Sequence, residues 1–475
     1  MTLSPSADQL PIDPILIDKI KTTVADSFAG TVARLADHVR IPGMAWDAYD
    51  PDLLDQSAQF VAEQCRAAGF TDVRILSAER TDRPGVQGAP AVLAHRPGPV
   101  GAPKVLLYAH HDVQPIGDED LWDTTPLEAT EVNGRLYGRG TADDKAGIMV
   151  HLAAIEALAH VAPETLERIG ITVFIEGEEE AGSPSFTNFL RENHDVLDAD
   201  VIVVADSSNW KVGEPALTSS LRGMLDATIE VKVMGHAVHS GMFGGPVLDA
   251  PTLLARIITS LHTADGSVAV PGLLSHDVAE IDYAEADYRR DAGVIDSLKL
   301  AGTGSIADRL WNRPAINLIG FDAPAVAVAS NTLLPSARAK VSVRLAPGQD
   351  PTAAMAALKD HVLVQDVMGA EVTFIEGEQG QPFSADTSTE IAQLQMAAFT
   401  AAWGKQAVTI GMGGSIPFVA DLKQQFPNAQ IMITGIEDPD TRAHSANESL
   451  HLGDFQHAIE AETIFLVSLA TRNKQ

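Results

Sequence analysis

Residues 105–115, VLLYAHHDVQP, decide the fold of this chain. The first five residues are apolar with no polar alternation, which is typical of a strand covered on both faces in a parallel α/β sheet. This strand runs directly into two histidines and an aspartate, so ionisable side chains stand where the backbone leaves the core. The stretch therefore predicts both a buried sheet and a functional site at its edge.

The surrounding sequence continues the same pattern. Other short apolar runs predict further strands, at 91–95, 170–176, 200–206, 407–411 and 429–435. Apolar residues at helical spacing predict helices, at 16–40, 52–68, 141–161 and 388–402. Thr141 and Asp144 are placed to cap the third of these helices. Strands that alternate with helices indicate a parallel α/β architecture.

A different pattern begins near residue 219. Residues 225–233 and 337–346 alternate strictly between apolar and polar side chains, which is typical of antiparallel strands with one solvated face. Helical stretches near 250–262 and 352–367 can cover the other face. We therefore expect an α/β protein whose mostly parallel-sheet domain is interrupted by a smaller α+β domain with an antiparallel sheet. The expected boundaries are 1–218 and 382–475 for the larger domain and 219–381 for the smaller one.

The composition excludes several classes of partner. The chain has 475 residues, and 64 acids against 33 Lys plus Arg give it a formal net charge of −31. A protein this acidic repels phosphate groups, so we expect binding to neither nucleic acid nor an anionic membrane. Cys65 is the only cysteine, so no internal disulfide can form. No stretch has the character of a signal peptide or reaches the roughly 18 apolar residues of a membrane span, and a cytoplasmic protein is expected.

Carboxylates and imidazoles stand where the predicted strands end. In an open parallel sheet, ligands bind beyond the carboxyl ends of the strands. Five segments contribute such side chains: His110, His111 and Asp112; Asp143 and Asp144; Glu176, Glu178, Glu179 and Glu180; Asp206; and His444. Each segment alone has a common structural alternative, such as a satisfied histidine, a solvated acidic loop or a helix cap. Together the segments favour one site at one edge of the sheet.

The combination of residue types indicates a metal site. Clustered carboxylates repel one another and raise each other's pKa values, and a divalent cation removes this repulsion. Imidazole and carboxylate ligands suit zinc, and also manganese or cobalt. Two ions about 3.5–4 Å apart are feasible if one carboxylate bridges them, and such a pair polarises a carbonyl and acidifies bound water. A free glutamate nearby would accept the proton of that water.

Seven motifs along the chain are familiar in type and in order: YAHHDVQP, LYGRGTADDKAG, EGEEEAGS, VVADSSNW, HSGMFGG, GGSIP and AHSANE. They resemble the di-metal aminopeptidase-like metallopeptidase family, which holds carnosinase-type dipeptidases, glutamate carboxypeptidases and N-acyl amino-acid deacylases. The HxDVQP and GRGTxDDK forms are most similar to the carnosinase-type dipeptidase branch. The resemblance covers about residues 90–450, which is most of the chain.

This resemblance implies roles for the residues at the strand ends. It implies two divalent ions per subunit. Zn is the expected metal, and Mn and Co are the alternatives. One ion would be held by His110, Asp143 and Asp206, and the other by Asp143, Glu180 and His444. Asp112 would orient His110, and Glu179 would be the general base. His111 occupies a variable position of the motif and receives no role.

The resemblance also implies a role for the inserted domain, which in this family is a lid that mediates dimerisation in many members. The chain would then form a homodimer in which His239 completes the partner's site by donating to the developing oxyanion. Arg344 would bind the terminal carboxylate of the substrate, and Ser415 and Thr332 would make weaker substrate contacts. A loop histidine and a solvated strand arginine are the alternative readings of His239 and Arg344.

The predicted activity is that of a co-catalytic di-metal hydrolase, which cleaves the peptide bond of dipeptides with a free C-terminal carboxylate. An N-acyl amino-acid amidohydrolase with the same metal centre is the alternative, so the expected substrate is a dipeptide or a small N-acyl amino acid. Related dipeptidases often carry Arg-Glu before GGSIP, where this chain has Gly411 and Met412, and this leaves the finer preference open. A non-catalytic binding protein would lack a ligand or the base, but every matched ligand and Glu179 are present in this sequence. A serine hydrolase would need a G-x-S-x-G motif, and GGSIP lacks its final glycine.

Overall fold

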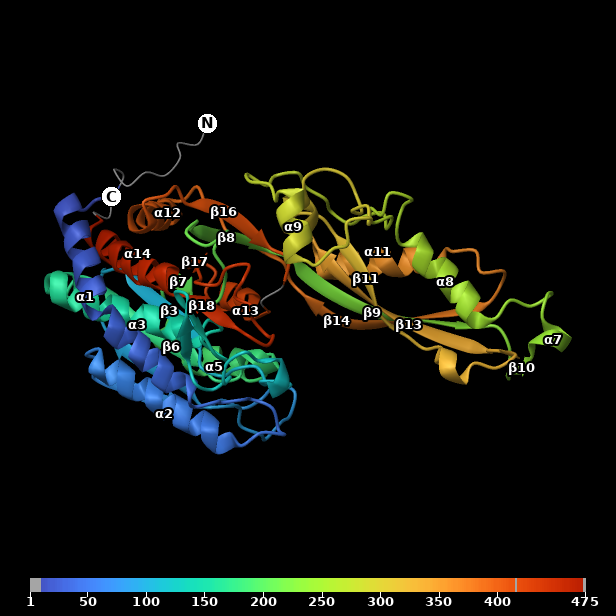
Figure 1. Cartoon of the computed structure of the whole chain (residues 1–475), viewed down its shortest axis with the longest axis horizontal. Helices are drawn as coiled ribbons and strands as arrows, with labels where there is room; N and C mark the ends of the chain where they lie inside the picture. Colours follow the sequence, from blue (N-terminus) through green and yellow to red (C-terminus); the bar gives the residue numbers. More distant parts are fainter. Residues whose placement is uncertain (1–9, 415–416, 473–475) are drawn as a thin grey trace. The chain divides into compact units, whose positions relative to one another are not determined.

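The computed structural model describes residues 10–414 and 417–472. Contacts between residues divide the chain into two compact units. Figure 1 colours the chain by residue number, from blue at the N-terminus to red at the C-terminus. Unit 1 comprises the chain up to Ser219, Ala385–Ile410 and the segment from Asp421 onward. Unit 2 comprises Ser220–Ser384 and Gly411–Ala420. Each unit has its own hydrophobic core.

The main sheet is parallel at its centre, where β6, β3, β7 and β17 lie side by side in that order (Figure 1). These strands span Gly170–Glu176 (β6), Lys104–His110 (β3), Val201–Val204 (β7) and Gln430–Ile433 (β17). On one side, β2 (Ala91–Arg96) pairs antiparallel with β6, and β1 (Asp72–Leu76) pairs antiparallel with β2. On the other side, β8 (Ala216–Leu221) pairs antiparallel with β17, and β15 (Phe383–Ser384) pairs antiparallel with β8. The strand β16 (Val408–Met412) also pairs with β8. Every residue of β6 and β7 is buried, as the unbroken apolar runs predict. The predicted fold class is confirmed.

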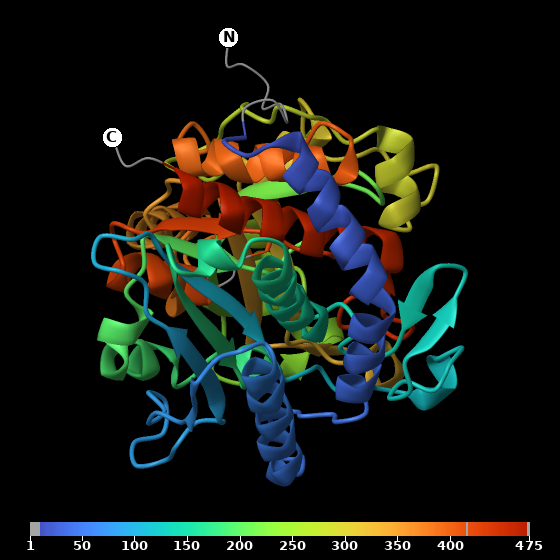
Figure 2. The same cartoon turned by 90° about the vertical axis from the view of Figure 1, so that its left-hand side faces the viewer.

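Long helices cover one face of this sheet. They are α1 (Pro14–Val39), α2 (Pro51–Ala67), α3 (Lys145–Val161), α12 (Glu390–Trp403) and α14 (Leu452–Thr471). Figure 2 shows α1 lying across α14, and both helices also contact α3. On β3, Val105, Leu107 and Ala109 point into this helical layer.

The other face of the sheet is packed with aromatic rings. Tyr108 of β3 and Phe174 of β6 lie against Phe186 and Phe189, and the ring centroids of Phe174 and Phe189 are 4.7 Å apart. The last two rings belong to α5 (Phe186–Glu192), which is followed by α6 (His194–Leu197). Because alternate residues of a strand point to opposite faces, β3 is held on both sides and its carboxyl end is rigidly placed.

A small sheet joins two segments that are far apart in the sequence. It consists of β4 (Thr130–Val132), β5 (Arg135–Tyr137) and β18 (Ser449–His451). Ser449 pairs with Tyr137 across β18 and β5. The residues that follow β5 therefore lie beside the residues that precede β18.

Unit 2 contains a four-stranded antiparallel sheet in the order β11, β13, β9, β14 (Figure 1). These strands span Ala315–Phe321 (β11), Ser336–Leu345 (β13), Gly223–Lys232 (β9) and Glu371–Gly380 (β14). The apolar residues of β9 and β13 are buried against α8 (Ala250–Ser260) and α11 (Pro351–Leu363), so the predicted alternation is confirmed. The smaller elements are β10 (Val238–His239), α7 (Ser240–Phe243), α9 (Glu285–Asp291), α10 (Ile306–Trp311), η4 (Val326–Val328) and β12 (Thr332–Leu333).

The predicted cap of the helix at 141–161 is wrong. The helix α3 begins at Lys145, and although Asp144 is its N-cap residue, the Asp144 side chain makes no capping hydrogen bond. One carboxylate oxygen of Asp144 instead accepts the backbone N–H of His110 at 3.2 Å. Thr141 donates its hydroxyl to the carbonyl of Gly138. Both side chains therefore shape the loop between β5 and α3 instead of starting a helix.

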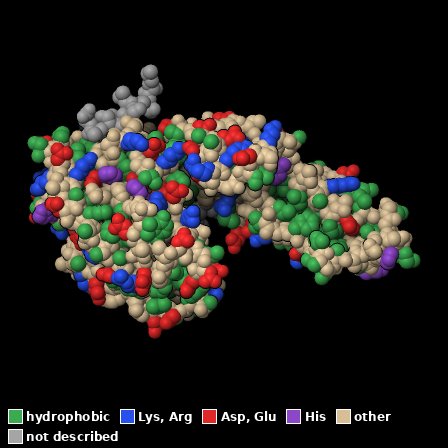
Figure 3. Space-filling model, viewed as in Figure 1, with side chains coloured by type: hydrophobic (Ala, Val, Ile, Leu, Met, Phe, Trp, Pro, Cys, Tyr) green, Lys and Arg blue, Asp and Glu red, His purple; other side chains and the backbone are tan. Residues whose placement is uncertain are grey.

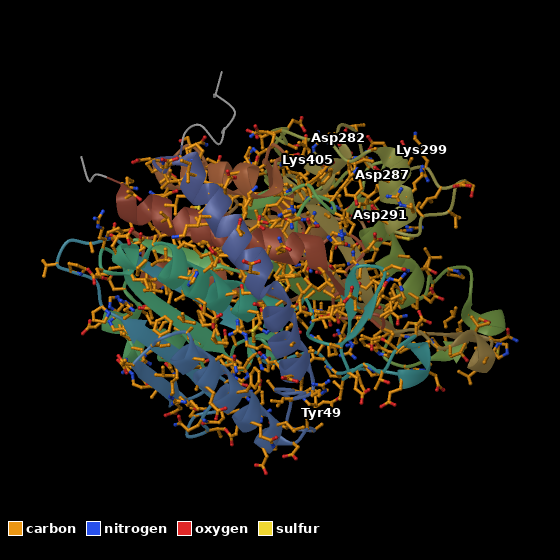
Figure 4. All side chains as sticks on the ribbon, turned by 60° about the vertical axis from the view of Figure 1, so that its left-hand side comes forward. Tyr49, Asp282, Asp287, Asp291, Lys299 and Lys405 are labelled. Atoms are coloured by element: carbon orange, nitrogen blue, oxygen red, sulfur yellow. The ribbon has the colours of Figure 1, made fainter. Side chains whose placement is uncertain are left out.

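Many acidic side chains on the surface take part in local contacts. Figure 4 labels Asp287 and Asp291, which lie on α9. Both carboxylates form ion pairs with Arg290, at 2.8 and 3.0 Å. Surface pairs of this kind contribute little to stability. Among the described residues, no helix is both long enough and apolar enough to cross a membrane.

Candidate metal centre

The carboxyl edge of the parallel strands gathers ionisable side chains from five segments of unit 1. His110 is the last residue of β3, and Asp206 follows β7 by two residues. Glu180 lies in the 3₁₀ helix η3 (Glu179–Ala181), which follows β6. Asp143 precedes α3, and His444 lies in the loop between β17 and β18. Their convergence follows from the order of the strands in the sheet.

These side chains form two groups that share one carboxylate. In the first group, the ligand atoms of His110, Asp143 and Asp206 lie within 4.8 Å of one another. In the second group, the same limit holds for Asp143, Glu180 and His444. The structure therefore brings together all five residues that the resemblance associates with metal binding.

The imidazole of His110 is fully buried and is oriented by Asp112. Its Nδ1 lies 3.1 Å from the main-chain oxygen of Asp112 and 3.3 Å from the Asp112 carboxylate. Its Nε2 has no hydrogen-bond partner among the described residues, although it lies 3.2 Å from an oxygen of Asp143. A buried nitrogen that faces carboxylate oxygens without a hydrogen bond is placed as a metal ligand would be.

Asp112 also holds the segment that carries the glutamates. Its two carboxylate oxygens accept the backbone N–H groups of Glu179 and Glu180, each at 3.1 Å. The strand β3 already ends at His110, so the contact between Asp112 and His110 arises from the irregular segment that follows the strand. One buried carboxylate thus connects the end of β3 with the start of η3.

Asp143 lies between the two histidines. One of its oxygens is 3.2 Å from Nε2 of His110, and the other is 3.0 Å from Nε2 of His444. Burial alone would raise the pKa of Asp143, but the contacts with the two imidazoles hold it well below its usual range. Asp143 therefore remains ionised with an oxygen toward each group, which is the arrangement of a bridging ligand.

The other carboxylates repel one another. Burial raises the pKa of Glu180 to about 8, and the charge of Asp143 acts in the same direction. Burial likewise raises the pKa of Asp206 to about 6. A divalent cation in each group would neutralise these charges, and the mixture of imidazole and carboxylate ligands fits Zn, Mn or Co. The residues present therefore fit a pair of metal ions.

The three consecutive glutamates at 178–180 have different surroundings. Glu178 is buried and accepts hydrogen bonds from Ala89 and from the backbone and hydroxyl of Ser185, so it holds the loop in place. Glu180 accepts two hydrogen bonds from Gln114, at 3.1 and 2.6 Å. Glu179 belongs to neither ligand group. Burial, and next the charge of Asp206, raise the pKa of Glu179 well above its usual range.

The neighbouring histidine of the first motif points elsewhere. His111 is buried, and its Nε2 lies 2.8 Å from the carbonyl of Pro90. Burial lowers the pKa of His111 to about 4, so its imidazole is neutral at physiological pH. Its omission from the predicted site agrees with this geometry.

Several residues around the site were not assigned from the sequence. Gln114 supports Glu180, and Glu437, which follows β17, has a pKa raised well above its usual range by burial and by Asp143 and Asp206. Arg139 and Glu448 form a buried ion pair with an N–O distance of 2.6 Å. Three of these four residues stand inside quoted motifs, but only the folded chain shows what their side chains contact.

The residues expected to contact substrate lie in unit 2. His239 ends β10, pairs with Thr332 of β12, and accepts the N–H of Gly241 through Nδ1. Arg344 lies near the end of β13, where burial and the charge of Arg344 lower the pKa of Arg222 to about 10. Unit 2 thus holds two neighbouring guanidinium groups. No role was assigned to Arg222 from the sequence. Ser415 lies outside the described residues.

Comparison with known proteins shows the family of this chain. The model of "Peptidase family M20/M25/M40" matches residues 106–467, and the chain therefore belongs to this family of metallopeptidases. It is 34% identical over 422 residues to the cysteinylglycine-S-conjugate dipeptidase of Corynebacterium striatum, and the match covers 88% of this chain and 90% of that enzyme. The predicted resemblance to the carnosinase-type branch is confirmed.

Solved structures share the fold. Human carnosine dipeptidase 1 has a TM-score of 0.74 and 23% identity, and the match covers 97% of this chain and 99% of that chain. A dinuclear metal binding peptidase of the M20 family from Bacillus subtilis has a TM-score of 0.57 and 12% identity, with 94% and 98% of the two chains covered. Dinuclear metal binding is thus found in this family, and the present chain has a cluster of suitable ligands.

Proposed function

We propose that this protein is a dipeptidase that uses two divalent metal ions. The observation that carries the proposal is the pair of ligand groups that share Asp143. The carboxylate of Glu179 lies near both groups and belongs to neither. His110, Asp143 and Asp206 would hold one ion, and Asp143, Glu180 and His444 the other. When bound, the ions would polarise the scissile carbonyl and acidify a water molecule. Zinc is our first expectation for both positions, and Mn and Co remain alternatives.

The residues around the ions then divide the work. Glu179 accepts a proton from the attacking water and delivers it to the leaving amine. Asp112 keeps the ring of His110 in place through Nδ1, so that Nε2 faces the ion. Burial raises the pKa of Glu179, which makes its carboxylate a better acceptor for the proton of the attacking water. The predicted cytoplasmic location stays a prediction.

The relatives suggest the class of substrate. Their names refer to cysteinylglycine conjugates and to carnosine, both of which are dipeptides. We therefore expect the metal-loaded protein to hydrolyse Cys-Gly and β-Ala-His dipeptides faster than N-acetyl or N-succinyl amino acids. Kinetic constants for both groups of compounds would test this. Faster hydrolysis of the N-acyl amino acids would favour the amidohydrolase, which none of the reported relatives supports.

Arg344 is expected to bind the carboxylate of the substrate. Replacing Arg344 by alanine should raise KM for free dipeptides by about 10- to 100-fold, as loss of charge-assisted hydrogen bonds would do. The change should be small for C-terminally amidated dipeptides, which offer no carboxylate. Arg338→Ala is a matched control, because Arg338 lies on the same strand and forms an exposed ion pair with Asp322. Equal cleavage of amidated and free dipeptides by the unmutated protein would contradict this role.

Unit 2 has features of a dimerisation surface. β11 is an edge strand of its sheet, and its residues Leu318 and Ile319 are about half exposed, at 48% and 56%. Figure 3 shows hydrophobic side chains at the surface of this unit. Among the described residues of unit 2, Val326 and Val328 are strongly exposed, at 93% and 72%. Exposed apolar edge strands favour association with another chain. A homodimer, in which His239 donates to the oxyanion in the partner's site, is consistent with these features.

Mixing two inactive variants would test the shared site. His239→Ala and Glu179→Ala should each be nearly inactive alone. In a mixed dimer, one site would have an intact Glu179 and an intact His239 from the partner. Random exchange should therefore restore about a quarter of the unmutated activity, because half of the dimers are mixed and each has one working site. The absence of any recovery, in a preparation where subunit exchange is demonstrated by native mass spectrometry, would exclude the shared site.

A further inference from the structure

The two ligand groups differ in how they are supported. In the first group, His110 ends β3 and Asp206 follows the adjacent parallel strand β7, and Tyr108 pairs with Val204 just before them. The N–H of Ala205 also donates to the carbonyl of Tyr108. The first group is therefore anchored directly on the buried centre of the main sheet.

The second group depends on a loop. His444 lies between β17 and β18, and its side chain is 59% exposed. Three residues of this loop, Arg442, His444 and Asn447, have φ angles of 57°, 60° and 64°. This left-handed conformation is uncommon for residues other than glycine, although His and Asn adopt it more readily than most. Because the side chain of His444 is also largely exposed, a contact between its loop and another segment must hold it toward Asp143.

Glu448 makes that contact. Its carboxylate is completely buried and accepts four hydrogen bonds from the segment that leads to Asp143. The donors are the guanidinium of Arg139 at 2.6 Å and the backbone N–H groups of Gly140 at 3.0 Å, Ala142 at 3.0 Å and Asp143 at 3.2 Å. Gly140 has a φ of 79°, which turns the backbone around the carboxylate. One side chain thus joins the loop of His444 to the loop of Asp143.

Arg139 extends the same connection. Its guanidinium donates to the carbonyl of Ser445, next to His444, and to the carbonyl of Pro115. It also lies over the ring of Trp122, with its central carbon 5.5 Å from the ring centroid. The pair is almost fully buried, and a buried ion pair is weak evidence for stability because desolvation offsets the attraction. Its contacts instead fix the geometry of the second group.

We infer that Glu448, paired with Arg139, is a positioning residue that selectively maintains the second metal position, formed by Asp143, Glu180 and His444. The inference rests on the proposed two-ion site. Loss of Glu448 should loosen the backbone at Asp143, which both groups share, but only the second group also loses the support of its histidine loop. His110 and Asp206 keep their support from the sheet. The two ions should therefore respond differently to the same substitution.

The test measures metal retention as well as activity. Unmutated protein and Glu448→Gln are loaded with Zn²⁺, dialysed against a series of free-zinc concentrations and analysed for zinc per chain. The variant should retain one ion as the unmutated protein does, and should lose the other at a free-zinc concentration about 10- to 100-fold higher than the unmutated protein requires. Its kcat should fall with the second ion and recover at excess zinc.

Controls separate positioning from stability. Asp454→Asn removes another buried carboxylate of unit 1, which accepts the N–H of Gly213 and the indole N–H of Trp403. This control should lower the unfolding temperature but leave both ions in place. If Glu448→Gln does not fold, Arg139→Gln, which leaves three backbone donors to Glu448, should show the same one-ion loss to a smaller extent.

Two results would overturn the inference, and they can be distinguished. Parallel loss of both ions, or no loss, in a folded variant would refute the positioning role but leave the two-ion site intact. Fewer than two ions in the saturated, unmutated protein would refute the proposed function together with the inference.

Discussion

Glu179→Ala is expected to lower kcat for dipeptides by about 10²–10⁴-fold, while two metal ions per chain are retained. Glu179 lies outside both ligand groups, so its removal leaves every proposed ligand in place. Its carboxylate therefore remains available for proton transfer when both ions are bound. Steady-state kinetics combined with elemental analysis of the same sample would check the prediction.

Glu178→Gln is the matched control for this experiment. Glu178 is the preceding residue and also a buried glutamate, but it accepts hydrogen bonds from Ala89 and Ser185. Its replacement should destabilise the fold by about 1–3 kcal/mol, because buried donors lose a charged acceptor, and should leave most of kcat. If Glu179→Ala retained full turnover, or if Glu178→Gln lost turnover in its place, Glu179 would not be the base.

Asp143→Ala is expected to abolish metal binding at both positions and activity with it. Asp143 is the only residue common to the two groups, and it lies 3.2 and 3.0 Å from the two histidines. Its removal leaves two protein ligands in each group and two imidazoles without their anionic partner. The loss in metal affinity should exceed the roughly 10- to 100-fold that is caused by replacing residues that only hydrogen-bond to a metal ligand. Calorimetric titration of the metal-free protein with Zn²⁺ would measure it.

Asp206→Ala provides the comparison, because Asp206 belongs to the first group alone. This variant should still bind one ion through Asp143, Glu180 and His444. An Asp143→Ala protein that binds as much zinc as Asp206→Ala would show that Asp143 does not bridge two ions.

Part of the fold could be predicted from local pattern. The uninterrupted apolar runs of β3, β6 and β7 predicted a sheet covered on both faces, and every residue of β6 and β7 is buried. The alternation in β9 and β13 predicted one buried face, which the core of unit 2 confirms. Such patterns are readable because side-chain period and burial are properties of a few neighbouring residues.

The predictions failed where a side chain had a distant partner. Asp144 was expected to cap a helix, but its carboxylate accepts the N–H of His110. Glu448 stood in a quoted motif without a role, although it holds backbone groups about 300 positions earlier in the chain. Arg222 was missed because only folding brings it near Arg344. None of these contacts can be predicted from the spacing of residue types along a short stretch of sequence.

The sequence by itself therefore determined the kinds of side chain at the strand ends and the period of the elements that present them, since both are set by residues a few positions apart. The family resemblance implied two ligand groups that share Asp143, but only the tertiary structure brings their atoms together and shows that Glu448 joins the loops of Asp143 and His444. The physical reason is that these contacts depend on strand order and on buried charge, and both arise from pairings between remote segments of the chain.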